Sequence, residues 1–406
     1  METQKQVATE KIKAHLQMLC TTIGERAVGS ANNRKATDYV HRTVQNFGWE
    51  VEKTELAVMD WTTDGATLAC GEQSFEVFAS PYSLGGEVVG ELLAIDTLQK
   101  LEQAEISGKI VLLYGEIAAQ QIMPKNFPFW NPEEHQHLVS LLEGGKALSI
   151  ITATARNAAL AGGVYPFPMF EDGDFDLPNV FMKDSEGEKL LACAGHTITL
   201  ISNVNRIPET AYNLVARKNS SAPERIVLSA HIDTKKGTPG ALDNGTGVAA
   251  LLALAELLQN LLPKYTIELA FFNGEDYYNV PGQMKYMEQN FGKFGNIALN
   301  INIDGAGYKE GKTAFSPFNV PENVEAVFQN VLAENPEITE GAPWYQGDHS
   351  MFLQQGVPAI AVCSQWFLEN MTTQTITHTP QDNLSIVNPE RVAEVALAIA
   401  ELLANV

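Results

Sequence analysis

The chain has 406 residues, 45% of them hydrophobic, and carries a formal net charge of −22 from 49 acidic and 27 basic residues. A chain of this length usually divides into two domains, each with room for its own hydrophobic core. The excess of acid, without a basic cluster in the sequence, argues against nucleic acid as a partner. Four cysteines without a CxxC pair are typical of reduced thiols in a cytoplasmic protein and predict neither disulfides nor cysteine metal ligands.

The sequence gives no sign of a secretory signal or of a membrane-spanning helix. The N-terminal residues lack the hydrophobic core and the small-residue cleavage site of a secretory signal, so we expect a cytoplasmic location. The longest hydrophobic stretch, 247–262, contains Glu256 and is shorter than the roughly 18–20 residues that span a bilayer. We interpret it as a buried helix that ends near Leu262 and expect no membrane partner.

Regular elements are predicted at both ends of the chain. Residues 8–48 predict two helices separated by a turn with Gly24 and Gly29, and residues 49–58 predict a strand with alternating character. From residue 212 onward, hydrophobic strands alternate with helices. This alternation is typical of a three-layer α/β fold, in which a mostly parallel mixed sheet lies between helices.

The middle of the chain has a different texture. Short β-rich segments separated by turns run from residue 59 to about residue 205, with two helical stretches and two loops rich in proline and aromatic residues. We therefore predict a smaller, β-rich domain over 59–205. It is inserted into a larger, discontinuous domain that consists of 1–58 and 206–406.

Acidic residues and histidines follow the predicted strands of the larger domain. In open parallel sheets, ligand sites gather at the carboxyl ends of the strands. Each residue also has an ordinary structural explanation, such as capping a helix, closing a turn or packing as a core histidine. Their occurrence after successive strands nevertheless favours a common site. The residues are His231, Asp233, Asp243, Glu275, Asp276, Asp304 and His378.

Imidazoles and carboxylates together form a donor set that suits zinc, or a similar divalent ion, in an open catalytic geometry. If one acid is shared, two ions about 3.5–4 Å apart hold a bridging water as hydroxide. A carboxylate beside that water takes its proton and passes it to a leaving amine. His231 and Asp233 face the same side of their strand, so the aspartate is placed to orient the imidazole.

The sequence resembles peptidase family M28, the co-catalytic zinc aminopeptidases. The motifs that carry the resemblance are HID, PGALDNGTG, FFNGED, NINIDGAG and THTPQDN, in this order. The segment 59–205 is similar to the protease-associated domain that several members of the family insert at this point.

The resemblance implies two divalent metal ions, most simply Zn²⁺. One ion is assigned to His231, Asp243 and Asp304. The other is assigned to Asp243, Asp276 and His378, so that Asp243 bridges the pair. Many family members have a glutamate where this chain has Asp276, whose side chain is one methylene shorter. A weaker or differently held second ion, and other metals such as manganese or cobalt, therefore remain open.

The resemblance also implies roles for residues around the ions. Glu275 is the expected general base, and Asp233 is expected to act through His231. The family further suggests a cis peptide bond between Asp243 and Asn244, although a cis bond before a residue other than proline costs about 2.5–4 kcal/mol.

Further polar residues near the motifs have alternative roles. Asp348 either orients a loop beside the site or caps the helix that follows it. Asp382 either supports His378 or closes its turn. We expect His349 to be exposed to solvent.

These inferences predict a metal-dependent exopeptidase, chiefly an aminopeptidase that removes N-terminal residues from short peptides by a metal-bridging hydroxide with Glu275 as general base. Surplus carboxylates near the metals suit a free substrate amine, whereas a carboxypeptidase would need a basic residue for the terminal carboxylate. Carboxypeptidase or dipeptidase action, a glutaminyl cyclase-like acyltransferase and a non-catalytic scaffold are the alternatives. Short peptides are the expected partners, and a homo-oligomer is left open.

Aromatic side chains are numerous in the loops of the inserted domain. We hypothesise that they cover the active-site cleft and limit access to short peptides, although most aromatic residues pack between loops and core. The residues are Phe127, Phe129, Trp130, Tyr165, Phe167 and Phe170.

Overall fold

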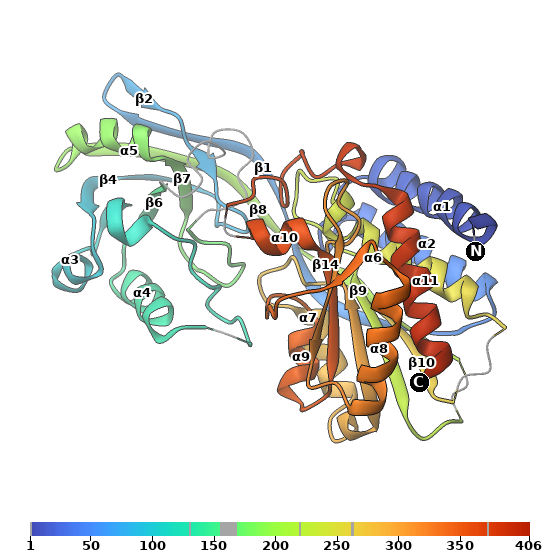
Figure 1. Cartoon of the computed structure of the whole chain (residues 1–406). Helices are drawn as coiled ribbons and strands as arrows, with labels where there is room; N and C mark the ends of the chain where they lie inside the picture. The colour runs from blue at the N-terminus through green and yellow to red at the C-terminus, as the bar shows by residue number, and fades with distance from the viewer. Residues whose placement is uncertain (1, 130, 155–168, 219–220, 261–263, 372) are drawn as a thin grey trace. The chain divides into compact units, whose positions relative to one another are not determined.

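A computed structural model describes the chain except for residues 1, 130, 155–168, 219–220, 261–263 and 372 (Figure 1). The chain forms two compact units, of which the first comprises Met1–Val58 and Thr210–Val406 and the second Met59–Glu209. The chain passes from one unit to the other within strands β1 (Glu50–Cys70) and β8 (Thr197–Lys218).

The first unit is built on a mixed sheet with parallel central strands. These strands lie in the order β14–β11–β9–β10, and each pair of neighbours is parallel. The strands are β9 (Arg225–His231), β10 (Thr266–Phe272), β11 (Ile297–Ile303) and β14 (Ala359–Ser364). Antiparallel pairings flank them, of β12 (Thr313–Phe318) with β14 and of β8 with β10, and β13 (Ile338–Glu340) pairs with β12 at the edge.

Helices cover both faces of this sheet (Figure 1). Every residue of β10 is buried, as expected for a strand enclosed between two helical layers. One helical layer consists of α1 (Glu2–Gln17), α2 (Ala31–Asn46), α6 (Thr246–Leu257), α8 (Glu322–Glu334) and α11 (Pro389–Asn405). On the other side lie α7 (Pro281–Gln289) and α9 (His349–Gln354), and the short α10 (Gln365–Asn370) follows β14. The prediction of a three-layer α/β fold with a mostly parallel mixed sheet is confirmed.

Helix α6 is the buried helix predicted from the hydrophobic stretch, but it ends earlier than expected. Its residues from Thr246 to Ala255 are all buried. The helix ends at Leu257, because the next polar residues, Gln259 and Asn260, are exposed and form turns instead of continuing the buried face. Leu262, the predicted end, lies outside the described residues. Among the residues that the structure describes, no helix is long and apolar enough to cross a membrane.

The second unit has its own hydrophobic cores, and its strands belong to the same continuous sheet, which β8 extends by pairing with both β10 and β4. The strands β4, β5, β6 and β7 are parallel neighbours, a feature that the sequence pattern did not predict. Separate hydrophobic clusters pack in this unit, one around Leu142 and Phe175 and the other around Ile151 and Leu200. The strands are β2 (Gln73–Phe75), β3 (Phe78–Ala79), β4 (Gly86–Ile95), β5 (Lys109–Leu113), β6 (Ser149–Thr154) and β7 (Asn179–Lys183), and the helices are α3 (Leu98–Gln103), α4 (Glu133–Gly144) and α5 (Asp184–Leu190).

Part of the aromatic group predicted for this unit is described. Phe127 and Phe129 contact each other edge to face, and Phe170 is buried and stacks on Phe175. Phe170 therefore belongs to the core of the unit. Trp130, Tyr165 and Phe167 lie outside the described residues. The covering role of these aromatics and the likeness to a protease-associated domain stay predictions.

The cysteines are free thiols, and three of them are buried, Cys20, Cys193 and Cys363. Burial raises the pKa of Cys20 to about 11. Burial, with the neighbouring Cys70, also raises the pKa of Cys193 to about 11. The pKa of Cys363 is raised well above its ordinary value for the same reason, burial. Each unit therefore contains at least one shielded and unreactive thiol.

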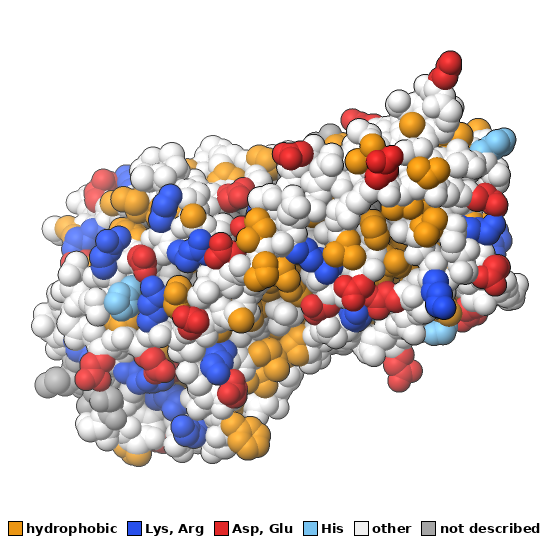
Figure 2. Space-filling view, turned by 180° about the vertical axis from the view of Figure 1, so that it is seen from behind, with side chains coloured by type: hydrophobic (Ala, Val, Ile, Leu, Met, Phe, Trp, Pro, Cys, Tyr) orange, Lys and Arg blue, Asp and Glu red, His pale blue; other side chains and the backbone are white. Residues whose placement is uncertain are grey.

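The surface carries mixed charge on the face that Figure 2 shows, where Lys and Arg side chains lie among Asp and Glu side chains. Ion pairs between partly exposed side chains include Lys53–Asp38 and Arg391–Glu337. They lie on the exposed surface and contribute little to stability individually.

Candidate metal centre

The candidate site lies where the parallel strands of the first unit end. His231 is the last residue of β9, and it pairs in register with Phe272, the last residue of β10. The turn after β10 carries Asp276, and Asp304 directly follows β11. Because β9 lies between β10 and β11, parallel pairing alone brings these three side chains to one edge of the sheet.

Asp243 completes this edge from the start of a helix. It lies in a short π-helical turn, Ala241–Gly245, that runs directly into α6, and its backbone angles are not helical. The peptide bond between Asp243 and Asn244 is cis, which confirms the sequence prediction. The Asn244 side chain donates to the Ile303 carbonyl at 2.8 Å and accepts from the Gly247 amide at 3.0 Å, and so ties this turn to β11.

The two oxygens of Asp243 face different histidines. Its Oδ1 lies 3.2 Å from His231 Nε2, and its Oδ2 lies 3.2 Å from His378 Nε2. His231 Nε2 is also 3.5 Å from Asp304 Oδ1, whereas His378 Nε2 is 2.9 Å from Asp276 Oδ1. The side chains therefore form two groups of one imidazole and two carboxylates, and Asp243 belongs to both.

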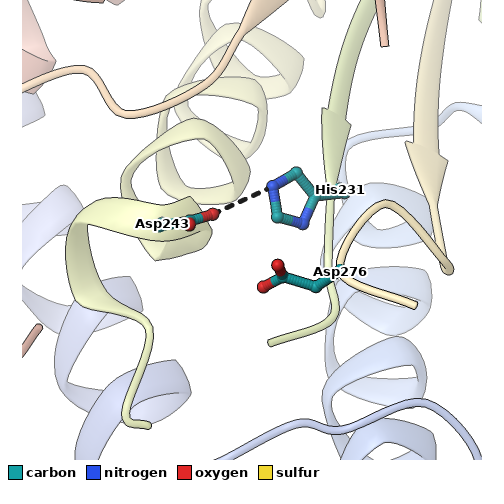
Figure 3. A group of neighbouring side chains, drawn as sticks. All are labelled: His231, Asp243 and Asp276. Carbon is teal, nitrogen blue, oxygen red and sulfur yellow. Dashed lines mark ion pairs between the residues drawn. The ribbon is translucent and has the colours of Figure 1, made fainter. Parts of the chain in front are cut away.

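The two groups lie close together, because Asp243 belongs to both. Donor atoms of His231, Asp243 and Asp276 all lie within 4.8 Å of one another, a spacing that one metal ion can also bridge (Figure 3). Asp276 is assigned to the second group because its Oδ1 lies only 2.9 Å from His378 Nε2. Figure 3 shows the imidazole and both carboxylates turned toward a common centre from three different elements.

The hydrogen bonds of the site also suit a divalent cation. His231 Nδ1 lies 3.2 Å from the backbone carbonyl oxygen of Asp233, so the proton of the neutral ring belongs on Nδ1 and the lone pair of Nε2 points at the carboxylates. Within the described part of the chain, His231 Nε2 and Asp276 Oδ2 are buried without a hydrogen-bond partner. Buried acceptors of this kind are costly unless a cation or a donor satisfies them.

Asp233 holds the turn that carries the acidic pair. Its Oδ1 accepts from the Gly274 amide at 2.8 Å, and its Oδ2 accepts from the Asp276 amide at 3.0 Å. The carboxylate is 3.7 Å from His231 Nδ1, beyond hydrogen-bond distance. The imidazole contact expected of this residue is thus made by its backbone carbonyl, while the side chain fixes the position of Glu275 between two anchored amides.

Glu275 is the most accessible carboxylate around the two groups. Its side chain is 26% exposed, against 13% for Asp243 and 14% for Asp304, and its Oε2 lies 4.0 Å from His231 Nε2. Burial raises the pKa of Glu275 well above its ordinary value, and the charges of Asp304 and Asp276 add to this shift. A carboxylate with a raised pKa is a stronger base.

Asp382 contacts the backbone before and at Asp243. Its carboxylate accepts from the amides of Leu242 at 2.6 Å and of Asp243 at 3.0 Å. Burial raises the pKa of Asp382 to about 7, with a further contribution from the charge of Asp243. The structure thus connects Asp382 to the shared carboxylate, a role that neither sequence interpretation contained.

The structure contradicts one of the two interpretations of Asp348, that it caps the following helix, and the expectation for His349. Asp348 precedes α9 but makes no capping hydrogen bond, and its Oδ1 accepts from the Gln283 amide group at 2.6 Å. The expectation that His349 is exposed is wrong. Its ring is fully buried against Trp344 and Phe318, and its Nε2 lies 2.8 Å from the Trp344 carbonyl oxygen.

Arg26 is a buried residue near the site that was not predicted from the sequence. It is the largest fully buried side chain of the described residues, and its guanidinium donates to the carbonyls of Ile232 and Gly240, in the loop between His231 and Asp243. A lone arginine in a polar stretch gives no signal of burial, because its acceptors in this loop lie about two hundred positions away in the sequence.

Histidines and carboxylates gathered at the ends of parallel strands are the arrangement expected of a metallopeptidase. Residues 213–403 match the sequence model of Peptidase family M28, the family that the sequence motifs predict.

Relatives by sequence include both aminopeptidases and carboxypeptidases. The chain is 26% identical over 319 residues to the "Probable lipoprotein aminopeptidase LpqL" of Mycobacterium tuberculosis, which covers 74% of this chain and 59% of the relative. It is 22% identical over 411 residues to "Carboxypeptidase Q" of Homo sapiens, which covers 95% of this chain and 82% of the relative. The chain thus spans 59% of the length of the mycobacterial relative.

Solved structures share the fold. An aminopeptidase from Aneurinibacillus sp. strain AM-1 has a TM-score of 0.75 at 21% identity, covering 97% of this chain and 92% of its own. BSAP, a zinc aminopeptidase from Bacillus subtilis, has a TM-score of 0.74 at 17% identity, covering 97% and 93%. A glutaminyl cyclase from Porphyromonas gingivalis has a TM-score of 0.53 at 14% identity, covering 98% and 97%. At these identities the similarity establishes the fold alone.

Proposed function

We propose that this protein is an aminopeptidase that uses two divalent metal ions, most simply Zn²⁺, to remove N-terminal residues from short peptides. The observation that carries the proposal is the placement of Asp243, whose two carboxylate oxygens each face a different imidazole at 3.2 Å. One group would hold the first ion through His231, Asp243 and Asp304. The second group would hold the other ion through Asp243, Asp276 and His378.

Glu275 is assigned the proton transfers. When bound, divalent ions at this site supply Lewis acidity and make water easier to deprotonate. Glu275 accepts a proton from the attacking water as the oxygen bonds to the scissile carbonyl carbon. The same carboxyl group then gives that proton to the leaving nitrogen as the carbon–nitrogen bond breaks. Asp233 keeps Glu275 in reach, because it anchors the amides on both sides of it, those of Gly274 and Asp276.

The charge of the site supports a free amine as the recognised end of the substrate. Acidic side chains outnumber the histidines in the two groups, and a substrate ammonium complements this surplus. Two arginines of β8 that could pair with a terminal carboxylate are engaged elsewhere. Arg217 pairs with Glu268 and Glu52, and Arg206 donates to backbone carbonyls of the second unit.

Carboxypeptidase action is the second candidate, because Carboxypeptidase Q aligns with 95% of the chain. Zinc-loaded protein should therefore be incubated with one peptide in four forms, which combine a free or acetylated N-terminus with a free or amidated C-terminus. The products are identified by mass spectrometry. We expect both peptides with a free amine to lose their first residue.

Other outcomes identify the alternatives. Cleavage only of the peptides with a free carboxylate would replace the proposal by a carboxypeptidase, and loss of ammonia from an N-terminal glutamine would indicate a cyclase. Glu275→Gln is the control, since it keeps the side-chain volume and removes the base. We expect it to lower kcat by about 10²–10⁴-fold without removing bound zinc. A cytoplasmic location and a homo-oligomer stay predictions.

A further inference from the structure

The loop between His231 and Asp243 is held on its carbonyl side by Arg26. The arginine is fully buried, and no carboxylate of the described residues forms an ion pair with it. All of its described guanidinium contacts are to backbone carbonyl oxygens. The acceptors within the loop are Ile232 at 2.9 Å, Pro239 at 2.8 Å and Gly240 at 2.8 Å.

The same loop is held on its amide side by Asp382. Three consecutive amides, of residues 241, 242 and 243, donate to this one residue. The first reaches its backbone carbonyl at 3.2 Å, and the others reach its two carboxylate oxygens at 2.6 and 3.0 Å. The hydroxyl of Thr238 adds a hydrogen bond to the Thr379 carbonyl at 2.9 Å. The loop is thereby bound to the segment that carries His378.

Gly240 lies where the two contacts meet and shows how closely the loop is packed. It has a left-handed backbone conformation, with φ of 57° and ψ of 55°. A Cβ atom at this position would lie 2.6 Å from the carbonyl oxygen of Asp243 and 3.1 Å from Arg26 Nη2. The backbone path to Asp243 therefore has little freedom as long as both contacts persist.

Backbone position matters more for Asp243 than for the other carboxylates of the site. An aspartate has only two side-chain torsions, and here its two oxygens must serve two histidines at once. A shift of the backbone cannot be corrected at one oxygen without moving the other. Groups that hold a ligand in place often change metal affinity about 10–100-fold when they are removed.

We propose that Arg26 and Asp382 are positioning residues that fix the backbone of Asp243 so that its carboxylate serves both metal groups. The inference rests on the proposed metal-dependent function, but it concerns the formation of the site and not the reaction. Arg26 acts from the N-terminal segment and Asp382 from the segment after His378, so the shared ligand is held by parts of the chain far apart in sequence.

The inference predicts how zinc binding changes in two variants. Asp382→Asn keeps the size of the side chain but loses one of the two acceptors, and Arg26→Lys keeps the charge but loses the planar fork of five donors. We expect both variants to weaken both zinc equivalents, each by about tenfold or more. His378→Ala, in contrast, should weaken only one equivalent, because this histidine belongs to one group.

The second unit offers matched controls. Asp172 also accepts from two backbone amides, those of Lys125 and Asp174, and Arg206 also donates to backbone carbonyls. We expect Asp172→Asn and Arg206→Lys to leave both zinc affinities unchanged. This comparison separates positioning of Asp243 from the general cost of altering a buried polar residue.

The experiment titrates metal-free, full-length protein with zinc by calorimetry and by competition with a chromophoric chelator. Far-UV circular dichroism confirms that each variant is folded, and hydrogen exchange over residues 239–246 reports whether the loop is loosened. Faster exchange together with weakening of both equivalents supports the inference. A folded Asp382→Asn or Arg26→Lys protein that binds two equivalents with parental affinity overturns it. If one of them does not fold, the other decides.

The outcomes also separate this inference from the proposed function. If the parent binds two zinc ions and the variants lose both, but no peptide is cleaved, the proposed function fails and the positioning role stands. If the parent cleaves peptides and the variants bind zinc like the parent, the positioning role fails alone. A parent that binds no zinc removes both.

Discussion

The buried carboxylate of Glu268 allows one interaction to be weighed with little other disturbance. This residue of β10 is fully buried, accepts from Arg217 Nε at 2.7 Å and accepts a short hydrogen bond of 2.5 Å from the Tyr286 hydroxyl. The pKa of Tyr286 is raised well above its ordinary value, first by burial and then by the charge of Glu268, so the hydroxyl remains a donor at any working pH. Tyr286→Phe removes this donor and leaves the ring in place.

The expected loss follows from the kind of hydrogen bond removed. Hydrogen bonds to charged groups contribute about 1.5–3 kcal/mol, and the unpaired oxygen has no access to water. The ring contacts of Tyr286 with Phe272 and Phe352 are kept, so no cavity term is added. We expect the free energy of unfolding of the first unit to fall by about 1.5–3 kcal/mol.

Urea unfolding followed by tryptophan fluorescence measures this loss. Tyr308→Phe is the control, because this buried ring stacks on Trp366 and no carboxylate of the described residues accepts from its hydroxyl. It should change the midpoint little. A loss below about 0.5 kcal/mol in Tyr286→Phe, similar to that of the control, would show that Glu268 does not depend on this donor.

Three other perturbations have defined outcomes. Burial lowers the pKa of His349 to about 4, so the native protein loses stability as the pH falls from about 6.5 toward 4. When unfolding is compared at pH 7 and pH 4, His349→Gln should remove about 3 kcal/mol of this loss. Gly240→Ala forces a Cβ to within 2.1 Å of Thr234 Cγ2 in a left-handed conformation and should cost about 2–4 kcal/mol in urea unfolding. His378→Ala should halve the stabilisation by zinc, which is about 2.7 kcal/mol per site at 100 times Kd, measured as the shift in thermal midpoint on adding zinc.

The first two of these perturbations have a control within the chain. His196 is exposed, so His196→Gln should leave the acid sensitivity as it is. Gly237 also has a positive φ but open space around its Cβ position, so Gly237→Ala should cost only the roughly 1 kcal/mol of backbone strain. Equal costs at Gly237 and Gly240, undiminished zinc stabilisation in His378→Ala, or unchanged acid sensitivity in His349→Gln would contradict the respective argument.

The sequence predicts the fold of the first unit well because its signals are local. The hydrophobic runs that become β9 and β10 and the alternation of strand and helix require no knowledge of distant residues. The strand-end rule also placed His231 and Asp304 at one edge of the sheet, because β9 and β11 are parallel neighbours. The parallel core of the second unit was less predictable, since its short strands carry little periodicity.

Other features depend on contacts that the sequence does not display. His349 follows an aspartate in a polar stretch, yet Trp344 and Phe318 enclose it. The buried contacts of Arg26 join residues more than two hundred positions apart, so no local pattern announces them. The carboxylate of Asp382 is four positions from His378 in sequence but binds the backbone of Asp243. Each case is set by tertiary packing and not by local propensity.

The shielded thiols give the protein internal reporters of its own opening. With a pKa of about 11, only about one in a thousand molecules carries a thiolate at Cys20 or Cys193 at pH 8, and both side chains are buried. An alkylating reagent can therefore modify them efficiently only while the surrounding structure is open. Cys20 belongs to the first unit and Cys193 to the second. Peptide mass spectrometry of a single labelled sample would therefore measure the rate at which each unit opens.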